Sequence, residues 1–168
     1  MAAGPAGRGG RGRGARVTAA EAFEYAVLRV VPRVDRGEAM NAGIVLYCRP
    51  RRYLGVRLAL DEGVLLALDP EADVPGVHRA LAALARVCGE PAAGERGTRA
   101  AGARELSARE PGTGAAGAQD IGRRFRWLTA PRSTVVQAGP VHTGLTRDPE
   151  AEIDGLLRAL VLRPGTAR

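Results

Sequence analysis

The sequence predicts an α+β domain with a mainly antiparallel sheet of about four strands, which two main helices cover. Residues 23–60 are the densest run of β-branched and aromatic residues, and only short polar turns interrupt them. Residues 74–88 and 148–163 instead repeat apolar residues at intervals of three and four, which is the period of an amphipathic helix. The short connections between the early strands favour antiparallel pairing, because a parallel crossover needs more chain.

Three consecutive strands are expected at residues 24–31, 42–48 and 53–60, and they form a meander. Both faces of the first strand are largely apolar, which is typical of a central strand. A fourth strand is expected at residues 133–138, and residues 140–144 are expected to form a polar turn after it. In the second strand, Gly43 indicates a bulge or the close approach of another group.

The helices are predicted from their end signals as well as their periodicity. A short helix is expected at residues 61–68 and a long one at 74–88, each with an aspartate before its first apolar residue. A further short helix is expected at residues 120–128. The last helix begins at the Asp148–Pro149–Glu150 sequence, which combines a cap, a proline and an acid, and it ends before Pro164.

We expect one domain within the 168 residues. Residues 1–16 are rich in Arg and Gly and are expected to be a disordered tail. The single domain is expected at residues 17–163, with a flexible insertion at 89–119 that is poor in large apolar residues. Residues 164–168 are expected to be a C-terminal tail.

The charge is +7, and the chain contains Arg but no Lys. Four of the arginines lie in residues 1–16, where there is no acidic residue. The total charge therefore does not indicate a basic surface on the folded part of the chain. Such a tail can bind nucleic acid through charge and guanidinium stacking. A solvated tail encoded by GC-rich sequence explains the same composition, and we favour it.

Cys48 and Cys88 are widely spaced and lack nearby histidine pairs, so they match neither a zinc signature nor a disulfide framework. Free thiols in a reducing cytoplasm are the expected state. No apolar run approaches the ~20 residues that span a bilayer, so we expect no membrane partner. The chain also lacks the phosphate-binding, dinucleotide-binding and zinc-protease motifs, and we expect no cofactor and no metal site.

Arg29 is expected on a mostly apolar face of the first strand, where a guanidinium needs an anionic or carbonyl partner. The partner is either an acid of the fold, such as Glu38, or a bound anion. The first alternative is favoured, because buried charges are usually paired within the fold.

A wider polar constellation joins the first hairpin to the later segment. Arginine, serine, threonine and amide donors together suit a phosphate or another anion, and the candidates are Arg29, Arg33, Asn41, Arg132, Ser133 and Thr143. In an enzyme, His142 would be the general acid or base and Glu38 would orient it. Turn hydrogen bonds and ion pairs explain the same residues without catalysis, and we favour that explanation because no nucleophile–base spacing is present.

Three segments carry a family resemblance: YAVLRVVPRVDRGEAMNAGIVLYC, FRWLTAPRSTVVQ and PVHTGLT. They resemble the bacterial domain of unknown function 3037 family, over about residues 22–163 and without most of 95–119. The family brings no established activity. The resemblance implies a genomic association, because members are often encoded beside proteins resembling HipA-type kinases of toxin–antitoxin systems.

The sequence therefore favours a small cytoplasmic domain that acts by binding, as the partner or modulator of a HipA-like kinase. The first alternative is an enzyme acting on a phosphate-bearing substrate through His142, Glu38 and the arginines. The second is nucleic-acid binding through the Arg-rich tail.

Overall fold

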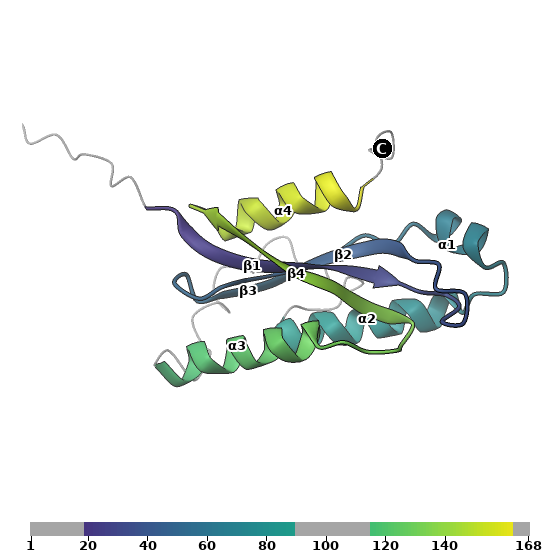
Figure 1. Ribbon diagram of the computed structural model, residues 1–168, viewed down its shortest axis with the longest axis horizontal. Helices are drawn as coiled ribbons and strands as arrows, with labels where there is room; N and C mark the ends of the chain where they lie inside the picture. The colour runs from purple at the N-terminus through teal and green to yellow at the C-terminus, as the bar shows by residue number, and fades with distance from the viewer. Residues whose placement is uncertain (1–18, 90–114, 163–168) are drawn as a thin grey trace, which may run out of the picture.

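A computed structural model describes residues 19–89 and 115–162 and shows three layers (Figure 1). The middle layer is a four-stranded antiparallel sheet in the order β3-β2-β1-β4. Its strands are β1 (Glu21–Val30), β2 (Met40–Cys48), β3 (Tyr53–Leu58) and β4 (Val136–Thr146). The predicted α+β class, the antiparallel sheet and the meander of the first three strands are confirmed.

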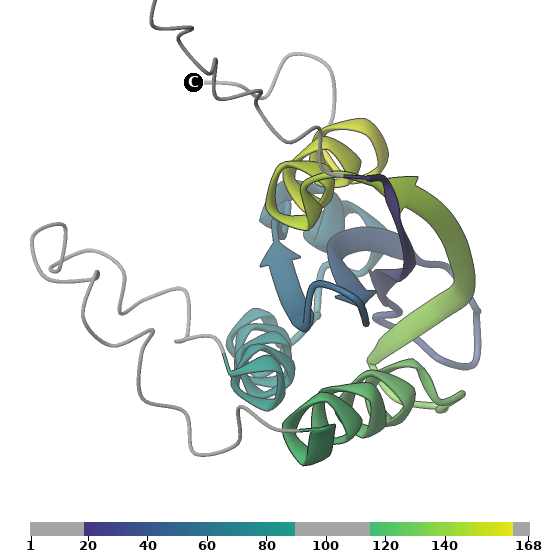
Figure 2. The ribbon, with the colours of Figure 1, turned by 90° about the vertical axis from the view of Figure 1, so that its left-hand side faces the viewer.

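The helices form the two outer layers. On one side of the sheet lie α2 (Val74–Cys88) and α3 (Ala115–Thr129), and on the other lies α4 (Pro149–Leu160), as Figures 1 and 2 show. The short α1 (Glu62–Leu68) lies at one end of the sheet. The aspartates Asp61, Asp73 and Asp148 accept hydrogen bonds from backbone N–H groups in the first turns of α1, α2 and α4, as their sequence positions predict.

The core explains why β1 is central. Ala26, Leu28 and Val30 are buried on the face that α2 and α3 cover. Phe23 lies on the opposite face, where it packs with Ile153 of α4. Side chains of successive strand residues alternate between faces, so a strand with neighbours on both sides carries apolar residues on both faces, as β1 does over most of its length.

The segment expected to be a turn at residues 140–144 is part of β4, so that prediction was wrong. Tyr25 pairs with His142 and Ala26 with Val141, which extends the strand to Thr146. Pro140 is accommodated because β4 is an edge strand with an irregular register at this point, where a missing N–H is tolerated. Long-range pairing with β1 thus overrides the local turn signal of proline, threonine and glycine.

The helix expected at residues 120–128 begins earlier, at Ala115, and spans 15 residues. There are therefore three long helices in the described part of the chain instead of the two main ones expected. Residues 115–119 had been assigned to the flexible insertion because they are only Ala, Gly and Gln, which form no apolar stripe. The tail at 1–16, residues 90–114 of the insertion and the tail at 164–168 lie outside the described residues.

Candidate functional site on β1 and β4

One half of the α4 side of the sheet is less covered than the other. α4 packs against β2 and β3. On the adjoining strands, Tyr25, Val27 and Arg29 of β1 are half-buried and His142 of β4 is exposed. This β1–β4 half of the face holds Arg29 and His142, two of the polar residues that the sequence singled out.

Arg29 lies in a row across the sheet. Its register partner on β2 is Asn41 and its register partner on β4 is Gln137. The Nε atom of Arg29 is buried and has no hydrogen-bond partner among the described residues. A Cβ built on Gly139 would lie 3.7 Å from this Nε, which places the Arg29 side chain beside β4 at a residue that has no side chain of its own.

The pairing of β1 is irregular on both sides of Arg29. Towards β2 the register shifts between Leu28 and Arg29, so that Leu28 pairs with Gly43 while Arg29 pairs with Asn41. Towards β4 it shifts between Ala26 and Leu28. In each case the neighbouring strand has one residue more than β1, which is the arrangement of a β-bulge. Bulges bend a strand locally and re-aim side chains, and two of them lie within three residues of β1 here.

An aromatic row follows along the same face. The rings of Phe23 and Tyr25 are 6.0 Å apart, and the rings of Tyr25 and His142 are stacked with centroids 5.2 Å apart. The Phe23 ring lies over Gly144, where an added Cβ would approach its Cζ to 2.6 Å. The ring contact gives His142 a structural role on the edge strand.

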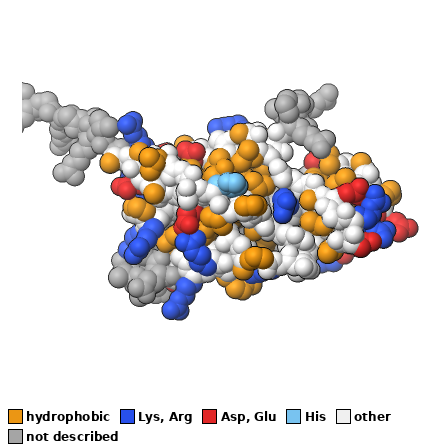
Figure 3. Space-filling model, in the orientation of Figure 1, with side chains coloured by type: hydrophobic (Ala, Val, Ile, Leu, Met, Phe, Trp, Pro, Cys, Tyr) orange, Lys and Arg blue, Asp and Glu red, His pale blue; other side chains and the backbone are white. Residues whose placement is uncertain are grey.

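The outer edge of β4 is the second feature of this half. β4 pairs with β1 on one side, and no described strand pairs with its other side. Its 11 residues include no charged side chain. Val141 is 40% exposed and Leu145 is 71% exposed; they pair with Ala26 and Ala22, so their side chains lie on the face of the sheet that α2 and α3 cover. In Figure 3, which shows the side of the molecule along which β4 runs in Figure 1, hydrophobic side chains gather across the middle of the surface.

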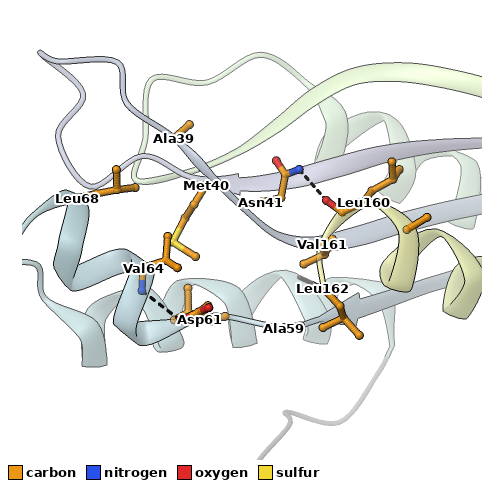
Figure 4. Close-up of a pocket in the computed structure, with 12 residues that line it drawn as sticks. Ala39, Met40, Asn41, Ala59, Asp61, Val64, Leu68, Leu160, Val161 and Leu162 are labelled. Atoms are coloured by element: carbon orange, nitrogen blue, oxygen red, sulfur yellow. Dashed lines mark hydrogen bonds between the residues drawn. The ribbon is translucent and has the colours of Figure 1, made fainter. Parts of the chain in front are cut away.

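Asn41 has a partner at the end of α4. Its Nδ2 donates a hydrogen bond of 2.8 Å to the carbonyl of Leu160 (Figure 4). This bond satisfies one of the carbonyls that a helix leaves open at its C-terminus. A pocket of about 630 Å³ opens beside it between α1 and the end of α4, and Met40, Val64 and Leu162 contribute to its wall, which is polar and apolar in equal parts.

The remaining candidates from the first hairpin have local partners. Arg33 forms an exposed ion pair of 3.3 Å with Asp35. The hydrogen bond from Arg33 holds the pKa of the Asp35 carboxyl below its ordinary value. Glu38 pairs with Arg36 at 2.9 Å, and not with Arg29.

The candidates of the later segment lie elsewhere. Arg132 lies over the ring of Trp127, 3.8 Å from its centroid, on the α3 side of the molecule, and also donates to the Trp127 carbonyl. Ser133 is exposed in the same connection before β4. Thr143 pairs with Glu24, one position along from His142, so the two side chains point to opposite faces of the sheet.

The structure therefore does not bring the eight predicted residues into one site. Arg29 and Asn41 are neighbours, whereas His142 lies beside Tyr25. Glu38 precedes Met40, which pairs with Val30 at the far end of β1. The five positions from Tyr25 to Val30 correspond to about 16 Å of strand. His142 and Glu38 are thus too far apart for one to orient the other.

Two residues of interest were absent from the sequence prediction. Gln137 joins the row of Arg29 through β4 pairing, which depends on long-range contacts. Arg57 on β3 pairs with Glu150 and Asp154 and ties α4 to the sheet. Burial acts to lower the pKa of the Arg57 guanidinium, but its hydrogen bonds to these carboxylates raise the pKa above the ordinary value. The sequence did contain a signal for Arg57, because this arginine stands between apolar residues of a predicted strand.

Cys48 and Cys88 are free and buried. In residues 19–89 and 115–162, histidine, cysteine and acidic side chains nowhere gather in a group of three that could hold a metal. None of the helices in these ranges is both long and apolar enough to traverse a bilayer.

A family model described as "Protein of unknown function (DUF3037)" matches residues 25–161. The chain belongs to this family. The match begins within β1 and ends just after α4, so it includes β2, β3, β4, most of β1 and the row of Arg29. The resemblance inferred from the three sequence segments is confirmed. Neither the curated proteins nor the solved structures contain a match to the chain.

Proposed function

We propose that this DUF3037 domain is a binding domain that accepts an extended segment of a HipA-like kinase along the free edge of β4. The single observation that supports this proposal is the character of that edge. β4 is 11 residues long and contains no arginine or acidic residue, and it exposes the apolar Val141 and Leu145 together with His142 and Thr143. An edge of this kind is a template for strand addition, in which backbone hydrogen bonds supply affinity and side-chain positions supply specificity.

The other edge of the sheet offers less. β3 has six residues, and its Arg57 is committed to Glu150 and Asp154 of α4. Natural sheets protect their edges with charges, short strands, prolines or bulges. β3 is short and charged, whereas β4 carries only Pro140 and the nearby bulge. A docked strand therefore has longer and less protected backbone to pair with on β4.

The kinase is proposed as the partner because members of the family are often encoded beside proteins resembling HipA-type kinases. A free strand edge is also suited to pairing with an extended segment of a protein. Family membership alone does not specify a function. In this proposal the domain works in the bacterial cytoplasm, where Cys48 and Cys88 remain thiols. It has no catalytic role, and it positions or restrains the kinase by holding one of its segments as a fifth strand.

The test is co-purification with a HipA-like kinase of the kind often encoded beside members of the family, followed by affinity measurement for edge variants. Leu145→Lys and Val141→Lys place a charge on the exposed edge, and we expect each to weaken binding by about tenfold or more. Leu66→Lys is the matched control, because Leu66 is 41% exposed but lies on α1. Unchanged affinity in both β4 variants, or an equal loss in the control, would refute docking at this edge.

The enzyme alternative is less well supported. It needs His142 and Glu38 to cooperate, and the positions of β1 beside which they lie, Tyr25 and Val30, are about 16 Å apart. Retention of kinase binding and of the cellular phenotype in His142→Ala and Glu38→Ala variants is the expected result. The nucleic-acid alternative depends on residues 1–16; binding of that kind should weaken steeply with salt and disappear when the tail is deleted.

A further inference from the structure

Arg29 is a cation without an acidic partner among the described residues. Its side chain is half-buried, its Nε is buried, and neither a hydrogen bond nor an ion pair links it to a described residue. Leaving a buried donor of a charged group unpaired is costly, and native structures rarely do so without a reason. The cost is offset when an acceptor binds at that position.

The nearby acids are paired elsewhere. Glu38 is engaged by Arg36, and both Glu150 and Asp154 are engaged by Arg57. Glu24 pairs with Arg126 and lies on the opposite face of β1 from Arg29. None of these four carboxylates is therefore free to pair with this guanidinium.

Around Arg29 lie two side-chain amides, the backbone carbonyl of Val27 and the space beside Gly139. The amide groups of Asn41 and Gln137 flank it in register, and their nitrogens donate to the carbonyls of Leu160 and Thr134. Each amide nitrogen carries a second hydrogen, so both can donate again. Gly139 leaves space beside the Nε, where a larger residue would bring a side chain.

The two bulges are an independent indication. Register shifts on both neighbours of β1 occur within the three residues that lead to Arg29. Bulges are over-represented next to functional sites, because they re-aim a side chain that regular pairing would fix. A row of donors, an unpaired guanidinium and two local distortions therefore coincide on one face.

We propose that Arg29, flanked by Asn41 and Gln137, binds an oxyanion, either a phosphate or a carboxylate. A guanidinium presents parallel N–H donors that match two oxygens of such a group, and it remains charged at all physiological pH values. This site lies on the face of the sheet and not on the β4 edge, so it does not depend on the proposed kinase docking.

The experiment is an NMR titration of the full chain in which the arginine Nε–H resonances are followed. Inorganic phosphate and acetate are added separately at constant ionic strength, with chloride as the balancing anion. We expect the Arg29 resonance to shift and to saturate, with half-saturation below about 10 mM for at least one of the two anions. Saturation by phosphate alone identifies a phosphate site, and saturation by acetate alone identifies a carboxylate site.

Arg29→Met and Arg33→Met are the matched variants, because Arg33 is exposed and already paired with Asp35. The anion should raise the melting temperature of the wild type and of Arg33→Met, and this rise should be absent in Arg29→Met. The wild-type titration needs no variant, so a folding defect in Arg29→Met does not leave the question open. A shift at Arg29 that is linear with concentration, or no larger than at Arg33, would overturn the proposal.

Discussion

Gly43 allows β2 to lie close to β3, and its replacement by alanine should lower the free energy of unfolding. A Cβ at this position would lie 2.6 Å from the backbone oxygen of Arg57 and 2.8 Å from Cδ2 of Leu58. The side-chain atom can move, but the backbone oxygen belongs to the β2–β3 pairing and cannot move without loosening it. Overpacking of this kind costs about 1–3 kcal/mol, and the backbone contact places Gly43→Ala at about 2 kcal/mol or more.

Gly155 provides the matched control for the same substitution. It lies within α4, and nothing is within 4 Å of the Cβ that alanine would add. Glycine inside a helix costs about 0.5–1 kcal/mol relative to alanine, so Gly155→Ala should stabilise the protein by that amount. The same glycine-to-alanine change is thus expected to lower the free energy of unfolding at residue 43 and to raise it at residue 155.

The assay is urea unfolding at 25 °C, monitored by circular dichroism, with the slope m compared between variants. A slope of about 1–3 kcal/mol/M converts the expected loss in Gly43→Ala into a fall of about 1 M in the midpoint. If the free energy of unfolding of Gly43→Ala is within about 0.5 kcal/mol of the wild-type value, then the close approach of the Arg57 carbonyl does not explain why glycine is needed here, and the prediction is refuted.

Three further predictions concern other parts of the molecule. Ile153→Ala should lower the free energy of unfolding by about 2–5 kcal/mol, because Ile153 is fully buried where α4 meets the sheet; urea unfolding measures it, and a loss below about 1 kcal/mol contradicts it. The Asp35 carboxyl should titrate below its ordinary pKa of 3.8, so its stabilising effect is present above that pH and fades as the pH falls through the lowered value; NMR titration should show that the Asp35 pKa rises towards its ordinary value in Arg33→Met. Arg132→Ala should shift the emission of Trp127, the single tryptophan, to longer wavelength, because the ring loses the guanidinium that covers it; unchanged emission would contradict the stacking.

The sequence was sufficient to predict elements whose signals are local. β1 to β3 follow from alternating apolar residues and short turns, and α2 and α4 follow from their apolar stripes and aspartate caps. The close approach at Gly43 was also anticipated, because glycine inside a strand weakens it unless another group needs the space. These features depend on residues within one turn or one hairpin of each other.

The end of β4 and the start of α3 could not be predicted in this way. Residues 140–144 pair with β1 more than 100 positions earlier, and a proline followed by small polar residues gives no local sign of that pairing. Helix α3 begins in alanine and glycine, where the apolar stripe that identifies a helix has not started. In both cases tertiary contacts determine the structure against a weak local preference.

The same distinction between local and long-range signals applies to the candidate site. Arg29 and Asn41 were correctly expected to be close, because one hairpin carries both and the bulge between Leu28 and Arg29 changes only their exact register. Arg132 and His142 were grouped with them on the assumption that the later segment folds back as one unit. It does fold back, but alternation along β4 and the connection from α3 place its polar side chains in separate places.

The two proposed sites use the same two strands in different ways, and this makes them separable. Kinase docking needs the outward edge of β4, where Leu145 is exposed, whereas anion binding needs the face on which Arg29 lies beside Gly139. Leu145→Lys should therefore weaken docking by about tenfold or more and retain the phosphate or acetate response of Arg29, and Arg29→Met should retain docking and lose the anion response. If Arg29→Met also weakens kinase binding by about tenfold, then the oxyanion is carried by the docked segment itself, and the edge and the face form one continuous binding surface.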